Sequence, residues 1–414
     1  MSWKAGVAVV VVFGTVLVAC GGSSSKSASS SSASSSTSST VAPAVVPAKY
    51  QALESQVSGD LSGYESAIAK MAPLGKTATT GSNVGWAELL AANGNRQDAL
   101  LAPTEMTTID QTLDAFKRLG VGGVVLGIKM PLLLSSFEPK ADQYAAFYAT
   151  VADHARARGF QIDVELSALF CGTIYAQCSY QYPNSPTGWA DLTAQQARIV
   201  IDRVHPEWLD LLSEPNTEVQ LTGIKELGTI AGLTQFVTSA VNAIGAHGGT
   251  KLVAGAASWY GPTYDQALVK TPIDGLVTHI YPASATTAAN LIATAKIAHD
   301  AGKPLIADET WLYKGQPTIS GGVAASNEQG ALCTYSFWQP LDVRFFRATR
   351  QWATKAGVPL ISGFWSQLAF AYLTWTPTLD AQPPAQQLAA STQAAQTAAS
   401  DNTTTQTGNA LVGR

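Results

Sequence analysis

Two glutamates, Glu214 and Glu309, each follow a short apolar run and are flanked by polar or aromatic residues. Glu214 lies in the sequence Leu-Leu-Ser-Glu-Pro-Asn, and Glu309 lies in Ile-Ala-Asp-Glu-Thr-Trp. Two carboxyl groups that face each other across a cleft can cleave a glycosidic bond, because one holds a proton for the leaving oxygen while the other is ionised to attack or to activate water. A separation of roughly 5–5.5 Å gives retention of configuration, and one of roughly 6.5–9.5 Å gives inversion.

Three more candidate residues combine polar and aromatic character. His279 and Tyr281 lie in the sequence Thr-His-Ile-Tyr-Pro, and Trp365 lies in Gly-Phe-Trp-Ser-Gln. Because side chains alternate between the two faces of a strand, His279 and Tyr281 are predicted to share a face. The same alternation predicts that Asp308 points away from Glu309, toward an outer layer of helices.

Each of these residues also has a purely structural explanation. Glu214 could be a surface residue at the start of a helix, since Ser-Glu-Pro-Asn is typical of a helix N-terminus. His279 could be a hydrogen-bonded core residue, Tyr281 could mark a strand end, and Trp365 could be core. Glu165, in Asp-Val-Glu-Leu-Ser, is a rival carboxylate that could bind substrate or support a polar network inside the protein.

The elements that must position these residues are short apolar runs that alternate with helix-like segments. Such alternation predicts βα units and a parallel sheet. The predicted strands are Thr77–Val84, Gly123–Ile128, Gln161–Leu166, Trp208–Ser213, Lys251–Ala256, Gly275–Ile280, Pro304–Asp308 and Leu360–Phe364. Eight units predict an α/β fold of the (β/α)8 TIM-barrel type, in which function lies at the C-terminal ends of the strands. The alternative, a doubly wound sheet, would usually show a glycine-rich phosphate loop, and the sequence has none.

The motifs and their order resemble those of the clan A glycoside hydrolases, a group of (β/α)8-barrel enzymes. The resemblance implies that Glu214, after strand four, is the acid/base and that Glu309, after strand seven, is the nucleophile. It implies that Tyr281 hydrogen-bonds the nucleophile and that Trp365 forms the floor of a sugar subsite. The implied reaction is a retaining double displacement on a β-linked oligo- or polysaccharide, without cofactor or metal. It requires a raised pKa for Glu214 and an ionised Glu309.

The sequence departs from the clan pattern at two positions. The clan has Asn before the acid/base, where it binds a substrate hydroxyl, whereas this chain has Ser213, whose single shorter hydroxyl would lose that contact or make it through water. The clan has an arginine after strand two, whereas this chain has Lys129. The residues expected to bind substrate are Ser213, Asn216, His279, Tyr281, Trp311 and Trp365. Trp311 and the nearby Trp338 could instead pack the long loop after strand seven.

Because Ser213 departs from the pattern, two other functions stay open. One is a non-catalytic glycan-binding or structural protein of the cell envelope, built on a hydrolase-like barrel. The other is a barrel enzyme with unrelated chemistry, since a fold does not fix a function. The formal net charge of −4 gives no basic surface for nucleic acid, so nucleic acid is not expected as a partner. We expect a monomer.

The N-terminal segment has the features of an export signal. Lys4 precedes an apolar run, Ala5–Ala19, which is about the length of a signal-peptide core and short for a bilayer span. The run ends in Leu-Val-Ala before Cys20, which resembles the lipobox of bacterial lipoproteins. The resemblance implies cleavage before Cys20, lipid attachment at that residue, and a membrane-anchored, exported protein of the cell envelope. The alternative is a short membrane anchor with an incidental cysteine.

Composition divides the chain into four parts: a signal peptide (1–19), a lipidated cysteine with a Ser-rich linker (20–47), a barrel domain (48–377) and a low-complexity tail (378–414). The linker has almost no apolar residues to bury, so it is predicted to be disordered. The tail is polar; one helix around Gln386–Ala399 is possible, and the last residues are predicted to be disordered. Cys171 and Cys178 could form a disulfide, which leaves Cys333 unpaired and buried. No Cys/His spacing indicates a metal site.

Overall fold

The computed structural model describes residues 45–75, 84–315 and 330–414. Cys20 and the Ser-rich linker up to Ala44 therefore lie outside the described residues. Residues Pro43–Arg414 form one compact unit. No helix within the described residues is long and apolar enough to cross a membrane.

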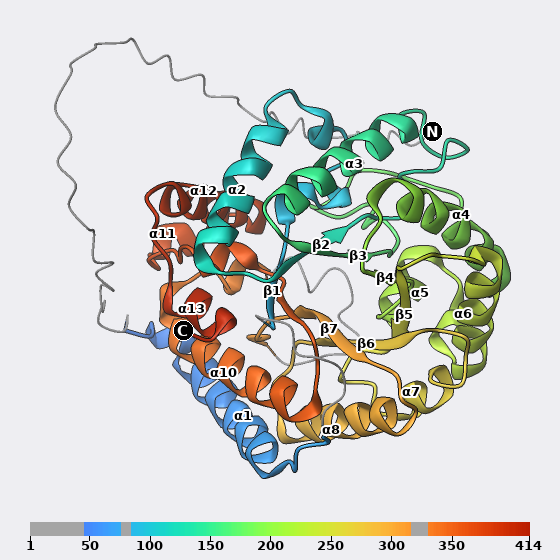
Figure 1. Ribbon diagram of the computed structural model, residues 1–414. Coiled ribbons are helices and arrows are strands. Elements are labelled where there is room, and N and C mark those ends of the chain that lie inside the picture. Colours follow the sequence, from blue (N-terminus) through green and yellow to red (C-terminus); the bar gives the residue numbers. More distant parts are fainter. Residues whose placement is uncertain (1–44, 76–83, 316–329) are drawn as a thin grey trace, which may run out of the picture. The chain divides into compact units, whose positions relative to one another are not determined.

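Eight parallel strands close into a barrel in sequence order, from β1 to β8 and back to β1 (Figure 1). They are β1 (Gly85–Glu88), β2 (Gly123–Gly127), β3 (Gln161–Glu165), β4 (Trp208–Asp210), β5 (Lys251–Gly255), β6 (Gly275–Ile280), β7 (Leu305–Thr310) and β8 (Ile361–Gly363). The predicted (β/α)8 TIM barrel is thus confirmed. The predicted first strand was misplaced, because β1 begins at Gly85, and most of Thr77–Val84 lies outside the described residues.

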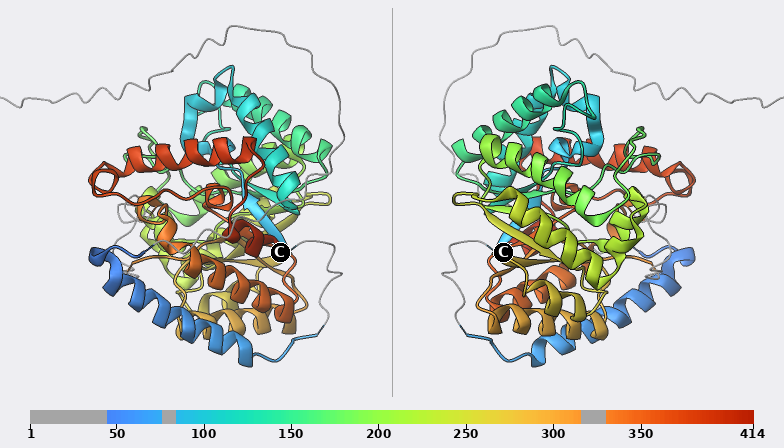
Figure 2. Two further views of the ribbon diagram at one scale, coloured as in Figure 1. Left: turned by 90° about the vertical axis from the view of Figure 1, so that its left-hand side faces the viewer. Right: turned by 90° about the vertical axis from the view of Figure 1, so that its right-hand side faces the viewer.

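Helices surround the barrel (Figure 1). Between consecutive strands run α2 (Glu105–Leu119), α3 (Ala141–Ala157), α4 (Pro186–Val204), α5 (Pro215–Thr222), α6 (Ile230–Ile244), α7 (Thr263–Leu268), α8 (Ala285–Asp300) and α10 (Gln339–Ala356). Before β1, α1 (Gln51–Lys70) packs along α8 and α10 (Figure 2). Gly120 and Gly357 end α2 and α10 in the left-handed conformation that glycine adopts without a steric cost.

The C-terminal segment is folded, so the possible helix at Gln386–Ala399 is confirmed as part of α12, and the prediction that the last residues are disordered was wrong. It forms α11 (Pro377–Asp380), α12 (Pro384–Ser400) and α13 (Gln406–Val412). α13 packs against α10, β1 and α2, so it completes the ring of helices after β8. A short apolar run, Ala410–Val412, is buried there, and Thr405 caps the helix by accepting from the Gly408 N–H at 3.1 Å. Three apolar residues in a polar tail are too few to indicate a buried helix from composition.

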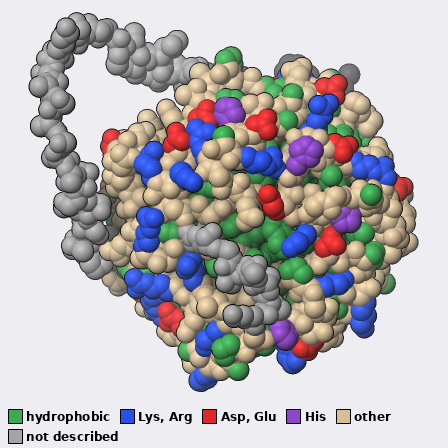
Figure 3. Space-filling view, in the orientation of Figure 1, with side chains coloured by type: hydrophobic (Ala, Val, Ile, Leu, Met, Phe, Trp, Pro, Cys, Tyr) green, Lys and Arg blue, Asp and Glu red, His purple; other side chains and the backbone are tan. Residues whose placement is uncertain are grey.

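The barrel interior changes from apolar to polar along its axis. Near the strand starts, the inward side chains form an apolar cluster: Trp86, Val125, Trp208, Val253, Val277, Ile306 and Leu360. Acidic side chains are buried further along β3, with Asp163 in the middle of the strand and Glu165 at its C-terminal end. Hydrophobic side chains are also visible near the centre of the molecular face seen along the barrel (Figure 3). The buried carboxylates at the C-terminal ends of the strands are therefore separate from this apolar cluster.

Candidate active site

Glu214 lies in the short connection between β4, which ends at Asp210, and α5, for which it is the N-cap residue. The predicted helix start is therefore confirmed, but Glu214 is not a surface residue, because its side chain is only 17% exposed and contacts His279. Its Oε2 accepts a hydrogen bond from Thr217 Oγ at 2.6 Å, one turn into α5. Its Oε1 lies 2.8 Å from His279 Nδ1. The helix start thus fixes one carboxylate oxygen, and the neighbouring histidine fixes the other.

His279, at the end of β6, is the centre of the site and is only 1% exposed. Its Nδ1 lies 2.8 Å from Glu214 Oε1 and 3.7 Å from Glu309 Oε2. Its Nε2 lies 2.8 Å from Ser213 Oγ. The Tyr281 hydroxyl lies 3.2 Å from His279 Nδ1 and donates to Glu309 Oε1. The residues that match or replace the clan motifs at the ends of β4, β6 and β7 therefore form one hydrogen-bonded group.

Asp308 does not face the helices, which corrects the prediction made from strand alternation. It is buried inside the barrel, and its Oδ1 lies 3.3 Å from His279 Nε2. The register of β7 shifts against both neighbouring strands at this point, between Ala307 and Thr310 on the β8 side. Such an irregularity breaks the period of two, so Asp308 and Glu309 both reach the same histidine.

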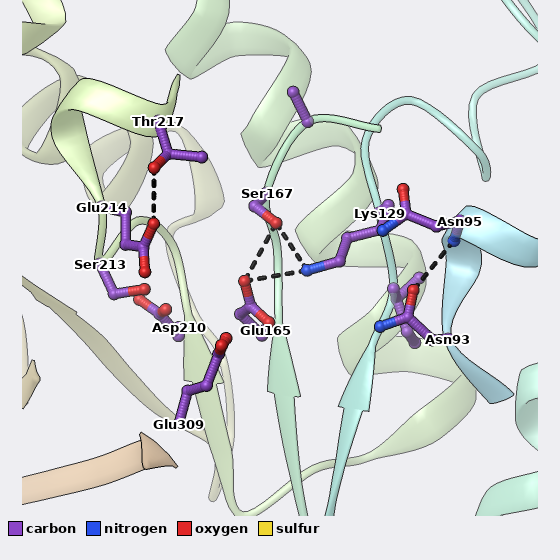
Figure 4. A network of polar contacts seen from close by, with 12 residues as sticks. Asn93, Asn95, Lys129, Glu165, Ser167, Asp210, Ser213, Glu214, Thr217 and Glu309 are labelled. Carbon is purple, nitrogen blue, oxygen red and sulfur yellow. Dashed lines mark hydrogen bonds and ion pairs between the residues drawn. The ribbon is translucent and has the colours of Figure 1, made fainter. Parts of the chain in front are cut away.

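The geometry limits how far apart the two candidate catalytic carboxylates can be. Since His279 Nδ1 is 2.8 Å from a Glu214 oxygen and 3.7 Å from a Glu309 oxygen, the two oxygens are separated by at most the sum of these distances. This upper limit for one pair of oxygens is compatible with the spacing of about 5–5.5 Å between carboxyl groups that a retaining mechanism uses. Figure 4 shows the carboxyl groups of Glu214, Glu165 and Glu309 converging from different strand ends.

Glu165 is a third carboxylate beside the pair. A carboxylate oxygen of Glu165, a ring nitrogen of His279 and a carboxylate oxygen of Glu309 all lie within 4.8 Å of one another. Lys129 Nζ donates to Glu165 Oε1 at 2.9 Å and to Ser167 Oγ at 2.7 Å (Figure 4). The interior of β3 is thus polar, as its sequence pattern predicted. Lys129, which follows β2 where the clan has arginine, pairs directly with Glu165.

The pKa shifts of the two glutamates are opposite to those expected for the clan mechanism, which requires a raised pKa for Glu214 and an ionised Glu309. Burial raises the pKa of Glu309 well above its usual range; the His279 charge opposes this rise, and the Glu165 and Glu214 charges add to it. The pKa of Glu214 is lowered although burial opposes this, because its hydrogen bond to His279 favours the carboxylate. The pKa of His279 is raised well above its usual value against its burial, chiefly by the charge of Glu309 and by Asp308. The free protein therefore favours an imidazolium beside an ionised Glu214.

Two groups of three side chains in the described residues bring possible metal ligands within 4.8 Å of one another: Glu165, His279 and Glu309, and Asp210, His279 and Asp308. Both depend on His279. Its two ring nitrogens are already within hydrogen-bond distance of Glu214 and Ser213, and a protonated imidazole has no lone pair for a metal. The donor set therefore fits a hydrogen-bonded network better than a metal centre.

The predicted aromatic residues differ in how accessible they are. Trp311 is 7% exposed and packs with Cys333 and Leu368, which matches the structural alternative given for it. Trp338 is fully buried. Trp365 is half-buried and meets Trp311 edge-on, with ring centroids 5.8 Å apart. Of these three tryptophans, Trp365 is therefore the one whose side chain is still partly exposed to solvent at the barrel mouth.

The loop after β3 contains a disulfide between Cys171 and Cys178, whose Cα atoms lie 4.8 Å apart. Asn95 Oδ1, from the loop after β1, accepts from the Phe170 N–H at 2.9 Å and ties the two loops together. Cys333 is unpaired and buried. These contacts stiffen one side of the barrel mouth.

Sequence reasoning missed several residues that surround the site. Thr217 binds Glu214, and Tyr260 accepts from the Asn216 N–H at 2.9 Å. Trp259 stacks on Tyr281, with ring centroids 4.9 Å apart. The signal for the last two was present, because Ser-Trp-Tyr follows β5 in the same polar–aromatic pattern that marks the other strand ends.

Comparison with known proteins gives likeness of fold only. No family model matches the chain, and no curated protein matches it. The structure is similar to a xyloglucan-specific β-1,4-glucanase of family GH5 from a ruminal metagenomic library, with 14% identity, 81% of this chain and 96% of that chain covered, and a TM-score of 0.45. It is similar to an exo-β-1,4-mannosidase from Opitutaceae bacterium strain TAV5 (15% identity, 79% and 62% covered, TM-score 0.48). It is also similar to a GH113 β-mannanase from Alicyclobacillus acidocaldarius (13% identity, 78% and 98% covered, TM-score 0.39). The structural neighbours are thus clan A glycoside hydrolases, and any statement on activity depends on the chain's own side chains.

Proposed function

We propose that the protein is a retaining glycoside hydrolase that cleaves β-linked glycans at the cell envelope. The observation that supports this proposal is that Glu214 and Glu309 both lie beside Nδ1 of His279, at 2.8 Å and 3.7 Å, which is compatible with the separation that a double displacement uses. The barrel positions them by strand order, since β4 and β7 end at the same mouth.

In the first step, a Glu309 oxygen attacks the anomeric carbon, and the bond to the leaving oxygen breaks as Glu214 gives that oxygen its proton. In the second step, water attacks the same carbon, Glu214 takes a proton from the water, and the bond to Glu309 breaks. The net reaction consumes one water and regenerates both carboxyl groups. Tyr281 donates to Glu309 and so helps to hold its attacking carboxylate in place.

The first step needs a protonated Glu214. In the free protein, however, the pKa of Glu214 is lowered and that of Glu309 is raised, which favours the proton on Glu309. Two coupled carboxyls titrate as a pair, so one proton can move between them when the surroundings change. Tyr281 donates to Glu309, and the His279 nitrogen that lies 2.8 Å from Glu214 can carry a further proton. A glycosidic oxygen bound next to Glu214 would favour the productive arrangement, because it supplies a partner for the proton there.

The test of activity uses residues 43–414, which form one compact unit. A panel of aryl β-glycosides and β-linked polysaccharides is offered to this protein, to Glu309→Gln, and to the matched control Glu226→Gln, which changes an exposed glutamate on the surface. We expect turnover by the first and the third and its loss in Glu309→Gln. No turnover of any glycan by the unaltered protein would refute the hydrolase function.

A second function is favoured by two observations. Ser213 stands where the clan has Asn and is bound to His279, and the pKa directions are opposite to the expected roles. Both fit a glycan-binding protein on a hydrolase-like barrel that has no turnover. Glycan binding that persists in Glu309→Gln, together with the absence of turnover in the unaltered protein, would establish this second function.

Lipid attachment at Cys20 and export to the cell envelope belong to the proposal and are supported by the sequence before Cys20. The test is mass spectrometry of the protein from the membrane fraction of a bacterial host. We expect an acylated N-terminal peptide that begins at Cys20, and release of Cys20→Ser from the membrane. An unmodified Cys20 in the membrane-bound protein would contradict the anchor.

A further inference from the structure

The loop after β5 holds two neighbouring aromatic residues, Trp259 and Tyr260. Both are half-buried, and neither belongs to any of the three apolar clusters formed by the described residues. Their backbone is nevertheless well anchored. The preceding Ser258 donates its N–H to the His279 carbonyl oxygen at 2.9 Å and accepts from Asn290 Nδ2 at 2.9 Å. A fixed tryptophan outside the core is better explained by binding than by stability.

These two rings lie on the Glu214 side of the mouth. The Tyr260 hydroxyl accepts from the N–H of Asn216, two residues after Glu214. Burial first, and then the Glu214 charge, raise the pKa of Tyr260 above its usual range. Trp259 stacks nearly parallel on Tyr281, with an interplanar angle of 28°.

From Trp259 the rings continue along the ends of the neighbouring strands β6, β7 and β8. Tyr281 lies 5.1 Å from Trp311, and Trp311 lies 5.8 Å from Trp365, centroid to centroid. The two half-buried tryptophans, Trp259 and Trp365, are therefore at opposite ends of one aromatic row. The candidate catalytic groups lie along this row, because Tyr281 donates to Glu309.

The chemistry of the proposed function, on which this inference rests, gives the two ends different roles. The group that donates a proton must lie next to the leaving oxygen, so the sugar that leaves is on the Glu214 side. We propose that Trp259 and Tyr260 form the binding site for the leaving-group sugar of the glycan. The apolar face of a pyranose ring stacks on Trp259, and the Tyr260 ring borders its edge.

The competing explanation is that Trp259 only supports Tyr281 and acts through it. The two explanations predict different results for substrates that share a glycone but differ in leaving group. A glycosyl fluoride has no leaving-group sugar, whereas a β-linked oligosaccharide has one. A loss of support for Tyr281 lowers both reactions equally, whereas a lost sugar site lowers mainly the second.

The experiment compares kcat/KM for the β-glycosyl fluoride and for the β-linked oligosaccharide of the same sugar, using the full chain, Trp259→Ala and Trp259→Phe. The matched control is Trp375→Ala, a half-buried tryptophan that packs on the main core. We expect the ratio of oligosaccharide to fluoride kcat/KM to fall roughly tenfold in Trp259→Ala, the equivalent of about 1.4 kcal/mol of lost stacking, and to fall less in Trp259→Phe. The control should leave the ratio unchanged.

An unchanged ratio in Trp259→Ala would overturn the leaving-group site, whether both reactions fall together or neither falls. Trp259→Phe keeps an aromatic ring and guards against a folding defect. If the unaltered full chain cleaves neither substrate for any sugar, the hydrolase function itself is refuted, and the leaving-group site with it. Turnover by the unaltered chain without an effect on the ratio refutes only the site.

Discussion

Removing the Tyr281 hydroxyl tests whether the contacts around Glu309 matter for turnover. Tyr281→Phe deletes one oxygen, which donates to Glu309 Oε1 and lies 3.2 Å from His279 Nδ1. A hydrogen bond to a charged group contributes about 1.5–3 kcal/mol, and a change of about 1.4 kcal/mol in a barrier alters a rate tenfold. We therefore expect kcat to fall about 10- to 150-fold.

The variant should also change the pH dependence in a defined direction. The Tyr281 hydrogen bond lowers the pKa of Glu309 against its burial, so its loss raises that pKa further. Glu309 must be ionised to attack, so the acid limb of the kcat/KM profile should move to higher pH. The assay is a pH profile of initial rates on the best aryl glycoside, next to far-ultraviolet circular dichroism to verify folding.

Tyr372→Phe is the matched control, because its hydroxyl also donates to a buried carboxylate, Asp342, at 2.8 Å, but lies away from the catalytic pair. It should keep both the rate and the pH profile, whatever it does to stability. Activity of folded Tyr281→Phe within twofold of the unaltered protein, with an unmoved acid limb, would refute the role given to this contact.

Two further predictions concern the acidic interior and the C-terminal helix. The charge of Glu165 raises the pKa of Glu309, so Glu165→Gln should move the acid limb of the kcat/KM profile to lower pH; an unmoved limb would mean that Glu165 does not act on Glu309. Leu411, in α13, is 2% exposed. Leu411→Ala should therefore lower the free energy of unfolding in urea by about 2–5 kcal/mol. The half-buried Leu388 of α12 serves as the matched leucine-to-alanine control, and an equal, small effect at both sites would show that α13 is not part of the folded barrel.

The barrel could be predicted from the sequence because its signals are local and repeated. An apolar run of strand length, a polar strand end and a helix recur along the chain, and parallel strands bring their C-terminal ends to one mouth. Glu214 and Glu309 could be chosen for the same reason, since each directly follows such a run. Neither the barrel fold nor the choice of these two glutamates depended on knowing which distant residues are in contact.

The features that could not be predicted depend on distant contacts. The orientation of Asp308 was wrong because a register shift in β7 depends on its neighbours, not on its own residues. The pKa of Glu214 is lowered against its burial by His279, from β6, and the pKa of Glu309 is raised by its burial and by the charges of Glu165 and Glu214. α13 was taken for disordered tail because its buried surface is supplied by α10, β1 and α2. In each case the structure is decided by contacts with residues far away in the sequence, which a local pattern does not reveal.

The most direct test of the central claim is to identify the residue that forms the covalent intermediate. The protein is incubated with a 2,4-dinitrophenyl 2-deoxy-2-fluoro-β-glycoside of the sugar that it hydrolyses, and the labelled peptide is sequenced by mass spectrometry. A retaining double displacement predicts one fluoroglycosyl group per chain, on Glu309, and no label in Glu309→Gln. A label on Glu165 or Glu214, or turnover of the parent glycoside without any trapped intermediate, would contradict the assignment.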